Sequence, residues 1–324
     1  MRTKNDHDKM LYCLIIGVSY NQPNFSSCAT WFPNATIIAS SQIIGLQPDA
    51  FFVNAINTIY MVKENNSQIL VRPQGYLNIA RTINGNFTRP KSLFVSAAGD
   101  IYVDTGFNRV DMYTRNSTSG VTVMNVNERC YSLFFDTNNT LYCSVSLLHQ
   151  VVKLSLNSST TIPTVAAGNG MNGSDSSQLS YPRGIFVDLN FDLYVADCRN
   201  DRVQLFHSGQ FAGITVAGNG SNHTIPINCP SSVVLDGSKN LFVADSNNNQ
   251  IIQLTSNSSR CIAGCFGNSS ITHQLNQPTT LSFDSYGNIF VTDRDNNQIV
   301  KFILATNSCG KYNTDLARQI KDQM

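Results

Sequence analysis

A segment of about 20 residues recurs six times along this chain, and its period constrains the fold more than any other feature. Each copy opens on a proline or, once, on a cysteine. The opening residues are Pro48, Pro90, Cys130, Pro182, Pro230 and Pro278. They lie 42, 40, 52, 48 and 48 residues apart, which is too long for leucine-rich or ankyrin repeats and typical of four-stranded propeller blades.

Three columns of the repeat keep their chemical character in all six copies. The second residue after the opening one is small: Ala50, Ser92, Ser132, Gly184, Ser232 and Thr280. The third is large and apolar: Phe51, Leu93, Leu133, Ile185, Val233 and Leu281. The twelfth is aromatic: Tyr60, Tyr102, Tyr142, Tyr194, Phe242 and Phe290. The chain is therefore expected to contain six structurally equivalent blades.

The fourth copy gives the clearest view of one blade. Its expected strands, A to D from the axis outward, are 181–188, 193–197, 202–206 and 213–218. Strands A and B are apolar at consecutive positions, whereas a strand of a two-sheet sandwich should alternate. A strand with a neighbouring sheet on each face does not alternate, so the pattern favours a propeller. We attribute the small column to crowding of six inner strands around one axis and expect it to lie nearest the axis.

The strand count predicts how the ring closes. The last copy supplies strands A, B and C, with 299–304 as strand C, and no strand D follows. The segment 36–40 resembles an orphan strand D and is predicted to complete this blade, which removes an open sheet edge. The predicted fold class is thus all-β: a six-bladed β-propeller of four-stranded blades, closed by an N-terminal strand. Cys28 and Cys309 flank this closure and are the expected staple.

The signature Pro-x-Gly-Ile-Phe-Val-Asp, Leu-Tyr-Val-Ala-Asp and Asn-Asp-Arg-Val, between Pro182 and Val203, resembles an NHL repeat. The resemblance extends over six copies, roughly residues 28–309, and is weaker in copies 1 and 3. The histidine that helps name the family is kept only as His149. The resemblance implies a binding platform, while related six-bladed rings include hydrolases and lyases. It therefore supports the fold more strongly than the function.

The N-terminal region is typical of a secreted protein. An apolar run at 10–18 follows basic residues, is too short to span a bilayer and suits a signal peptide. Gly17 and Ser19 are small enough for a cleavage site, and cleavage would remove Cys13 and leave eight cysteines. We predict a signal peptide at 1–20, the propeller at 21–309 and a short polar tail at 310–324. The expected location is extracellular.

Composition narrows the class of partner. Lys and Arg number 22 against 21 Asp and Glu, so no net field attracts nucleic acid. Charged residues make up only 13% of the chain, which is typical of proteins outside cells. We expect a monomeric propeller with a protein or glycan ligand, no nucleic acid and no membrane span.

The remaining cysteines are expected to form disulfides. Cys198 and Cys229 lie at the same end of adjacent blades. Cys130 and Cys143 bracket a hairpin about three residues out of register, so their pairing requires a bend. Cys261 and Cys265 can meet only if the chain turns at Gly264. The alternative for the last pair is a metal site with His273, which secretion and an even count of cysteines disfavour.

Twelve Asn-x-Ser/Thr sequons are candidate N-glycosylation sites, and most fall in expected loops. They are Asn24, Asn34, Asn65, Asn86, Asn116, Asn138, Asn157, Asn172, Asn219, Asn222, Asn257 and Asn268.

One end of the ring, here called the rim, is the expected binding surface. It combines the D–A loops 168–180, 218–228 and 267–276 with the B–C loops of blades 4 to 6. The candidate binding residues are Arg199, Asp201, Arg202, Asn247, Asn248, Arg294, Asp295 and Asn296. The alternative interpretation of the rim is a solvated polar edge that binds no partner.

No catalytic, cofactor-binding or metal-binding residue is assigned from the sequence. Two series of aspartates are better explained by turn chemistry than by calcium binding. One series lies between strands A and B: Asp136, Asp188, Asp236 and Asp284. The other follows strand B: Asp197, Asp245 and Asp293. The predicted function is a secreted, non-catalytic binding module without a cofactor. The alternative is an extracellular hydrolase or lyase with a calcium or zinc site built from loops in the central funnel.

Overall fold

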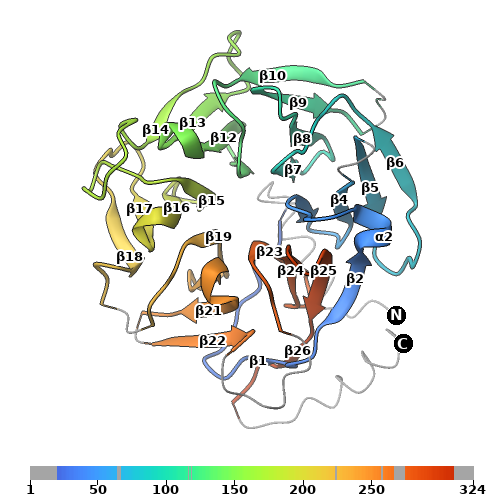
Figure 1. Ribbon diagram of the computed structural model, residues 1–324, viewed down its shortest axis with the longest axis vertical. Helices are drawn as coiled ribbons and strands as arrows, with labels where there is room; N and C mark the ends of the chain where they lie inside the picture. Colours follow the sequence, from blue (N-terminus) through green and yellow to red (C-terminus); the bar gives the residue numbers. More distant parts are fainter. Residues whose placement is uncertain are drawn as a thin grey trace.

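A computed structural model of the protein describes residues 20–63, 67–115, 117, 119–222, 225–256, 258–265 and 274–309. Six four-stranded antiparallel sheets surround a common axis, as Figure 1 shows. In each sheet the chain runs from an inner strand A to an outer strand D, except that the last blade takes its outer strand from the N-terminal part of the chain. The six-bladed propeller predicted from the repeat period is confirmed.

The blades follow the chain order. Blade 1 consists of β3 (Phe51–Val53), β4 (Ile59–Lys63), β5 (Gln68–Arg72) and β6 (Arg81–Asn84). Blade 2 consists of β7 (Leu93–Val95), β8 (Ile101–Asp104), β9 (Arg109–Tyr113) and β10 (Val121–Asn125). Blade 3 consists of β11 (Leu133–Phe135), β12 (Thr140–Val145), β13 (Gln150–Ser155) and β14 (Thr164–Ala167). Blades 4 to 6 are β15 (Pro182–Val187), β16 (Leu193–Asp197), β17 (Arg202–Phe206) and β18 (Ile214–Gly218); β19 (Pro230–Leu235), β20 (Leu241–Asp245), β21 (Gln250–Leu254) and β22 (Ser259–Ala263); β23 (Pro278–Phe283), β24 (Ile289–Asp293), β25 (Gln298–Phe302) and β2 (Thr36–Ser40).

The closure of the ring is confirmed, with one correction. Strand β2 pairs antiparallel with β25, as predicted for the segment 36–40. The expected strand 299–304 is too long, because β25 ends at Phe302 and Leu304 begins a separate strand, β26 (Leu304–Thr306). This strand pairs with β1 (Thr30–Trp31) in a two-stranded sheet at the seam. A short helix, α2 (Ser41–Ile44), follows β2 and leads into blade 1.

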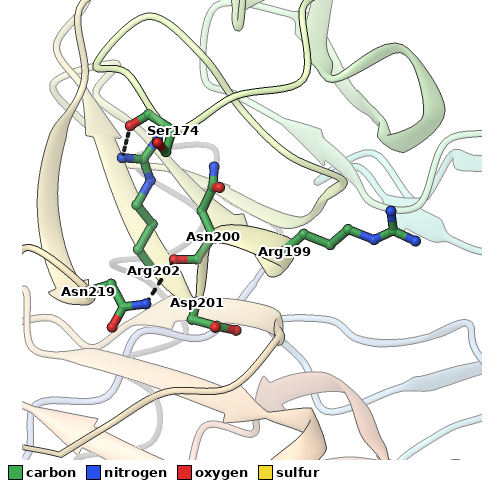
Figure 2. A pocket seen from close by; sticks show the side chains of 6 residues that line it. All are labelled: Ser174, Arg199, Asn200, Asp201, Arg202 and Asn219. Atoms are coloured by element: carbon green, nitrogen blue, oxygen red, sulfur yellow. Dashed lines mark hydrogen bonds between the residues drawn. The ribbon is translucent and has the colours of Figure 1, made fainter.

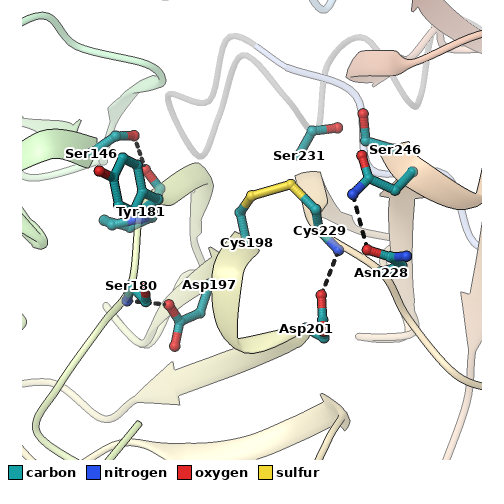
Figure 3. The surroundings of a disulfide bond; sticks show 12 residues. Ser146, Ser180, Tyr181, Asp197, Cys198, Asp201, Asn228, Cys229, Ser231 and Ser246 are labelled. Carbon is teal, nitrogen blue, oxygen red and sulfur yellow. Dashed lines mark hydrogen bonds between the residues drawn. A yellow bond between two sulfur atoms is a disulfide. The ribbon is translucent and has the colours of Figure 1, made fainter. Parts of the chain in front are cut away.

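Four disulfides form with the expected partners. Cys28–Cys309 joins the two ends of the propeller at the seam, and Cys198–Cys229 links blades 4 and 5 (Figure 3). Cys130–Cys143 forms because the chain bends ahead of Leu133, which is the residue that pairs with Cys143 in the sheet. Cys261–Cys265 closes around Gly264, whose φ of +73° provides the turn. Cys13 lies outside the described residues.

The small column of the repeat packs against the next blade, and Thr280 is its one member among the residues that line the axial cavity, contrary to expectation. A Cβ atom on Gly184 would lie 2.5 Å from the Cα atom of Ser232, and the hydroxyl of Ser132 accepts a hydrogen bond from the backbone N–H of Ile185 at 3.3 Å. Likewise, Ser232 accepts a hydrogen bond from the N–H of Leu281 at 3.2 Å. Crowding of the inner strands is therefore the correct cause, but the contact runs between blades.

Replacing Gly184 by valine should lower the free energy of unfolding by roughly 1–3 kcal/mol, because the larger side chain overlaps the backbone of β19. The φ of Gly184 is not in the left-handed region, so backbone strain does not contribute. Urea unfolding of the two proteins measures the difference. Equal stability would show that the interface between blades 4 and 5 has room to spare.

The end of the axis opposite the rim is closed by aromatic side chains. Phe52, Phe94, Phe134 and Phe186 come from the inner strands of blades 1 to 4, with neighbouring ring centroids 4.6–5.2 Å apart. The ring of Tyr20 packs against three of them and is buried. Tyr20 therefore belongs to the packed body, although it lies inside the predicted signal peptide. Residues 1–19 and 310–324, the rest of that segment and the predicted tail, lie outside the described residues.

The described residues contain no helix that is long and apolar enough to cross a membrane.

Candidate functional site

The aspartate that ends strand B organises the rim of blades 4 to 6. Asp197, Asp245 and Asp293 have no exposed surface. One carboxylate oxygen of each accepts a hydrogen bond from a backbone N–H of the preceding D–A loop, at 2.6–2.7 Å. The other oxygen accepts from an asparagine three residues later and from an arginine or glutamine five residues later, at 2.7–2.9 Å. The series between strands A and B similarly accepts backbone N–H groups two and four residues on, so turn chemistry explains both.

The position of the NHL histidine joins each blade to the next. Its occupants Asp201, Asn249 and Asn297 each accept, at 2.8 Å, the backbone N–H of the residue that enters the following blade. His149 accepts the N–H of Tyr181 at 3.3 Å through Nδ1, and burial lowers the pKa of this imidazole, which favours the unprotonated acceptor. All four residues are left-handed, a conformation that Asn and Asp tolerate well. The sequence marks this column but does not reveal its role as a latch between blades.

Half of the eight predicted rim residues hold the rim together. Figure 2 shows the Arg202 side chain extended toward Ser174, where its guanidinium donates to backbone carbonyls of the D–A loop. It also forms a 2.8 Å ion pair with Asp197, and both side chains are almost fully buried. Asp201 is a latch residue, and Asn248 and Asn296 are partners of the strand B aspartates. These four side chains are structural.

The other four predicted residues keep a surface toward solvent. The guanidinium carbon of Arg199 lies 3.6 Å from the centroid of the Tyr181 ring, and in Figure 2 the arginine extends away from the other labelled side chains. Asn247 exchanges hydrogen bonds with Asn228 and Gln277. Arg294 and Asp295 form a 3.0 Å ion pair.

The axial funnel is a cavity of about 180 Å³, and its lining residues were not identified from the sequence. It is lined by the residue that follows the opening residue of every repeat: Asp49, Lys91, Tyr131, Arg183, Ser231 and Thr279. Gln277, Thr280 and Arg294 complete the wall, so the funnel opens on the rim. Because the six occupants share no chemical type, a search for repeated character overlooks them. The small residues that were expected nearest the axis are therefore not its main lining, and the centre of the ring is charged.

Asp104 shows what happens where the partners of a strand B aspartate are absent. In blade 2 the position three residues on is Phe107, and Arg109 binds Asp111 at 3.0 Å instead. Burial raises the pKa of Asp104 to about 6, against partial compensation by the backbone N–H groups of Lys91 and Gly106. The folded protein therefore binds a proton at Asp104 in a pH range where the unfolded chain, with a pKa of 3.8, does not.

It follows that Asp104 contributes stability below pH 4 that is lost as the pH rises through about 6. The stability of the wild type relative to Asp104→Asn should increase by at most about 3 kcal/mol between pH 7.5 and pH 4, because other carboxylates cancel in the difference. Urea unfolding of both proteins across this range measures it. A difference that stays constant, or shrinks toward acid, would contradict the raised pKa.

Within the described ranges, no group of three or more His, Cys, Asp or Glu side chains is arranged to hold a metal ion. Cys261 and Cys265 form a disulfide, so the alternative metal site is not formed by these thiols. His273, its third proposed ligand, lies outside the described residues.

The sequons that the structure describes all carry exposed asparagines, as a glycan requires. They are Asn24, Asn34, Asn86, Asn138, Asn157, Asn172, Asn219 and Asn222. Asn172 and Asn219 lie in D–A loops at the rim. Asn65, Asn116, Asn257 and Asn268 lie outside the described residues.

The fold and the site define a six-bladed propeller with a charged funnel that opens between loops. The sequence model of the NHL repeat matches residues 275–302, in blade 6, and this match together with the fold supports an NHL-repeat six-bladed β-propeller. A search of curated proteins found no match.

Solved structures with the same fold differ widely in what they do. A streptogramin B lyase is 10% identical with a TM-score of 0.54, and the match covers 78% of each chain. An auxiliary nutrient binding protein from Bacteroides thetaiotaomicron is 12% identical with a TM-score of 0.60, over 89% of this chain and 76% of that one. A chain of a nidogen/laminin complex is 16% identical with a TM-score of 0.57, over 76% and 89%. At these identities the likeness establishes the fold alone.

Proposed function

We propose that this protein is an extracellular, non-catalytic binding module that holds a protein or glycan ligand on its rim. The observation that carries the proposal is the charged axial funnel, which opens at the centre of the rim, where the B–C loops also carry the exposed side chains of Arg199, Asn247 and Asp295. Binding residues are typically carried on loops that a rigid scaffold positions. Here the disulfide Cys198–Cys229 and the latch residues fix those loops.

Two further observations support this assignment. Four disulfides are typical of proteins in oxidising compartments. Among proteins of the same fold, one is a nutrient binding protein and another is part of a nidogen/laminin complex. Binding to a nutrient or to another protein is therefore chemistry that this scaffold can support.

Charge reversal on the two faces tests the proposal. The probe is an array of glycans and extracellular proteins, incubated with the labelled, oxidised propeller. We expect Arg199→Glu, at the rim, to reduce the signal on the bound spots at least about tenfold, which corresponds to roughly 1.4 kcal/mol. The matched control is Arg115→Glu, because Arg115 is exposed in the C–D connection of blade 2 at the opposite face. No binding to any spot, or a loss caused only by Arg115→Glu, would contradict rim binding.

The second candidate function is enzymatic, because a streptogramin B lyase has the same fold. In that case calcium or zinc would be held by loop residues in the funnel, where Asp49 is the one carboxylate among the lining residues. Elemental analysis of the dialysed protein distinguishes the two functions. One retained equivalent of calcium or zinc, or chemical change of a bound array ligand, would favour the enzyme over the binding module.

A further inference from the structure

The charges that line the axial funnel do not balance. Lys91, Arg183 and Arg294 are cationic, and Asp49 is the single anionic residue among the lining side chains. Asp49 is already bound on both oxygens, because Lys91 pairs with Oδ2 and Arg294 with Oδ1, the latter at 3.1 Å. The funnel therefore carries an excess of two positive charges. Low-dielectric walls concentrate such a potential and attract oppositely charged groups.

Arg183 is the cation that this arrangement leaves over. Within the described part of the chain it makes neither an ion pair nor a hydrogen bond, although it is half-buried in the funnel wall. Burial lowers the pKa of its guanidinium, Tyr131 and Asp49 oppose this change, and the positive charges of Arg294 and Arg199 add to it. A half-buried charge without a partner is costly, and an anion beside it removes that cost.

A second polar group in the funnel also lacks a partner. The hydroxyl oxygen of Thr279 is buried and has no hydrogen-bond partner among the described residues. Buried hydroxyls are usually satisfied by protein, water or a ligand. Arg183 and Thr279 both line the cavity, from blades 4 and 6 respectively. The funnel thus offers the guanidinium fork of Arg183, a donor that suits an oxyanion, and its wall also contains a hydroxyl that is buried without a partner.

The size of the funnel limits what can enter. Its volume of about 180 Å³ corresponds to roughly six water molecules and is smaller than typical pockets for whole drug-sized ligands, of ~300–1,000 Å³. We propose that the axial funnel binds the oxyanion group of an acidic ligand, with Arg183 as its principal donor, while the remainder of the ligand rests on the rim. This inference deepens the proposed function, since it gives the chemical class of the ligand on that face.

Titration calorimetry with small oxyanions tests the inference directly. The probes are D-glucuronate, sulfate and phosphate at matched ionic strength in chloride, with D-glucose as the uncharged control. We expect at least one oxyanion to bind with a Kd on the order of 0.1–1 mM and D-glucose not to bind. The three acids distinguish a carboxylate from a sulfate or phosphate group as the natural ligand. A wild-type protein that binds none of them would overturn the inference.

Substitution of Arg183 provides the second readout. Arg183→Met should weaken oxyanion binding at least about tenfold, whereas the control Arg115→Met, at an exposed position outside the funnel lining, should change it less than about threefold. In chloride buffer the Tm of Arg183→Met should equal or exceed that of the wild type, because no internal partner is left behind. Retained binding, or a lower Tm, would contradict the proposal that Arg183 is the principal hydrogen-bond donor to the anion.

The two proposals fail separately. If glucuronate binds through Arg183 but Arg199→Glu does not change binding to the array, the funnel site is supported and the rim function is contradicted. If array binding depends on the rim but every bound ligand is uncharged, the rim function stands and the oxyanion site falls.

Discussion

Replacing Cys28 and Cys309 together by serine should lower the free energy of unfolding of the oxidised protein by roughly 5 kcal/mol. The bridge closes a separation of 281 residues, and the entropy that a cross-link removes from the unfolded chain grows with the length of the loop. Its loss should also expose the seam, where β1 and β26 pair beside it. Urea unfolding of wild type and variant under oxidising conditions measures the effect.

The matched control is the double replacement of Cys261 and Cys265, whose bridge closes a separation of only 4 residues. The same argument predicts a loss of roughly 2 kcal/mol for this variant. If the two double variants are equally stable, loop closure does not explain how the ring is held shut.

Replacement of Arg202 by methionine should cost about 3–5 kcal/mol of stability, the second largest effect that we expect. The change leaves the carboxylate of Asp197 buried without its cation and releases the D–A loop carbonyls that Arg202 binds. Chemical denaturation measures the loss, and hydrogen exchange should show faster exchange in the loop 173–180.

Blades 5 and 6 supply the control for this experiment. They carry Gln250 and Gln298 where blade 4 has Arg202, and each glutamine donates to its strand B aspartate at 2.8 Å. Arg202→Gln should therefore keep the contact with Asp197 and lose about half as much stability as Arg202→Met. Arg199→Met, at an exposed position where only the contact with the Tyr181 ring is lost, should change stability by no more than about 1 kcal/mol. A fully stable Arg202→Met protein would falsify the structural role of this arginine.

The fold could be predicted because its determinants repeat. Every blade repeats an apolar run such as Ile185–Val187, with a small residue at the position of Gly184. Six weak signals therefore reinforce one another. The strands of blade 4 and the cysteine pairs followed from that register. The boundary at Phe302 was missed because Leu304 continues the apolar pattern, and only the pairing of β26 with β1 separates the two strands.

The site could be predicted only in part, for a related physical reason. Arg199 and Arg202 lie three residues apart in the sequence with equal charge, but one is exposed and the other is buried against Asp197. That difference depends on the path of the D–A loop, which lies far away in the sequence. The funnel was missed because its column varies from Asp49 to Arg183. In a repeat protein, repeated positions maintain the scaffold, and individual function is found where the copies differ.

The N-terminal strand that closes the ring has a consequence for biosynthesis. β2 leaves the ribosome early, but its hydrogen-bonding partner β25 is translated about 260 residues later. At typical elongation rates of ~5–20 residues per second, β2 waits on the order of 10–50 s as an unpaired edge. The nascent chain can therefore assemble blades 1 to 5 in order, while blade 6 must form last, from segments that are translated about 260 residues apart.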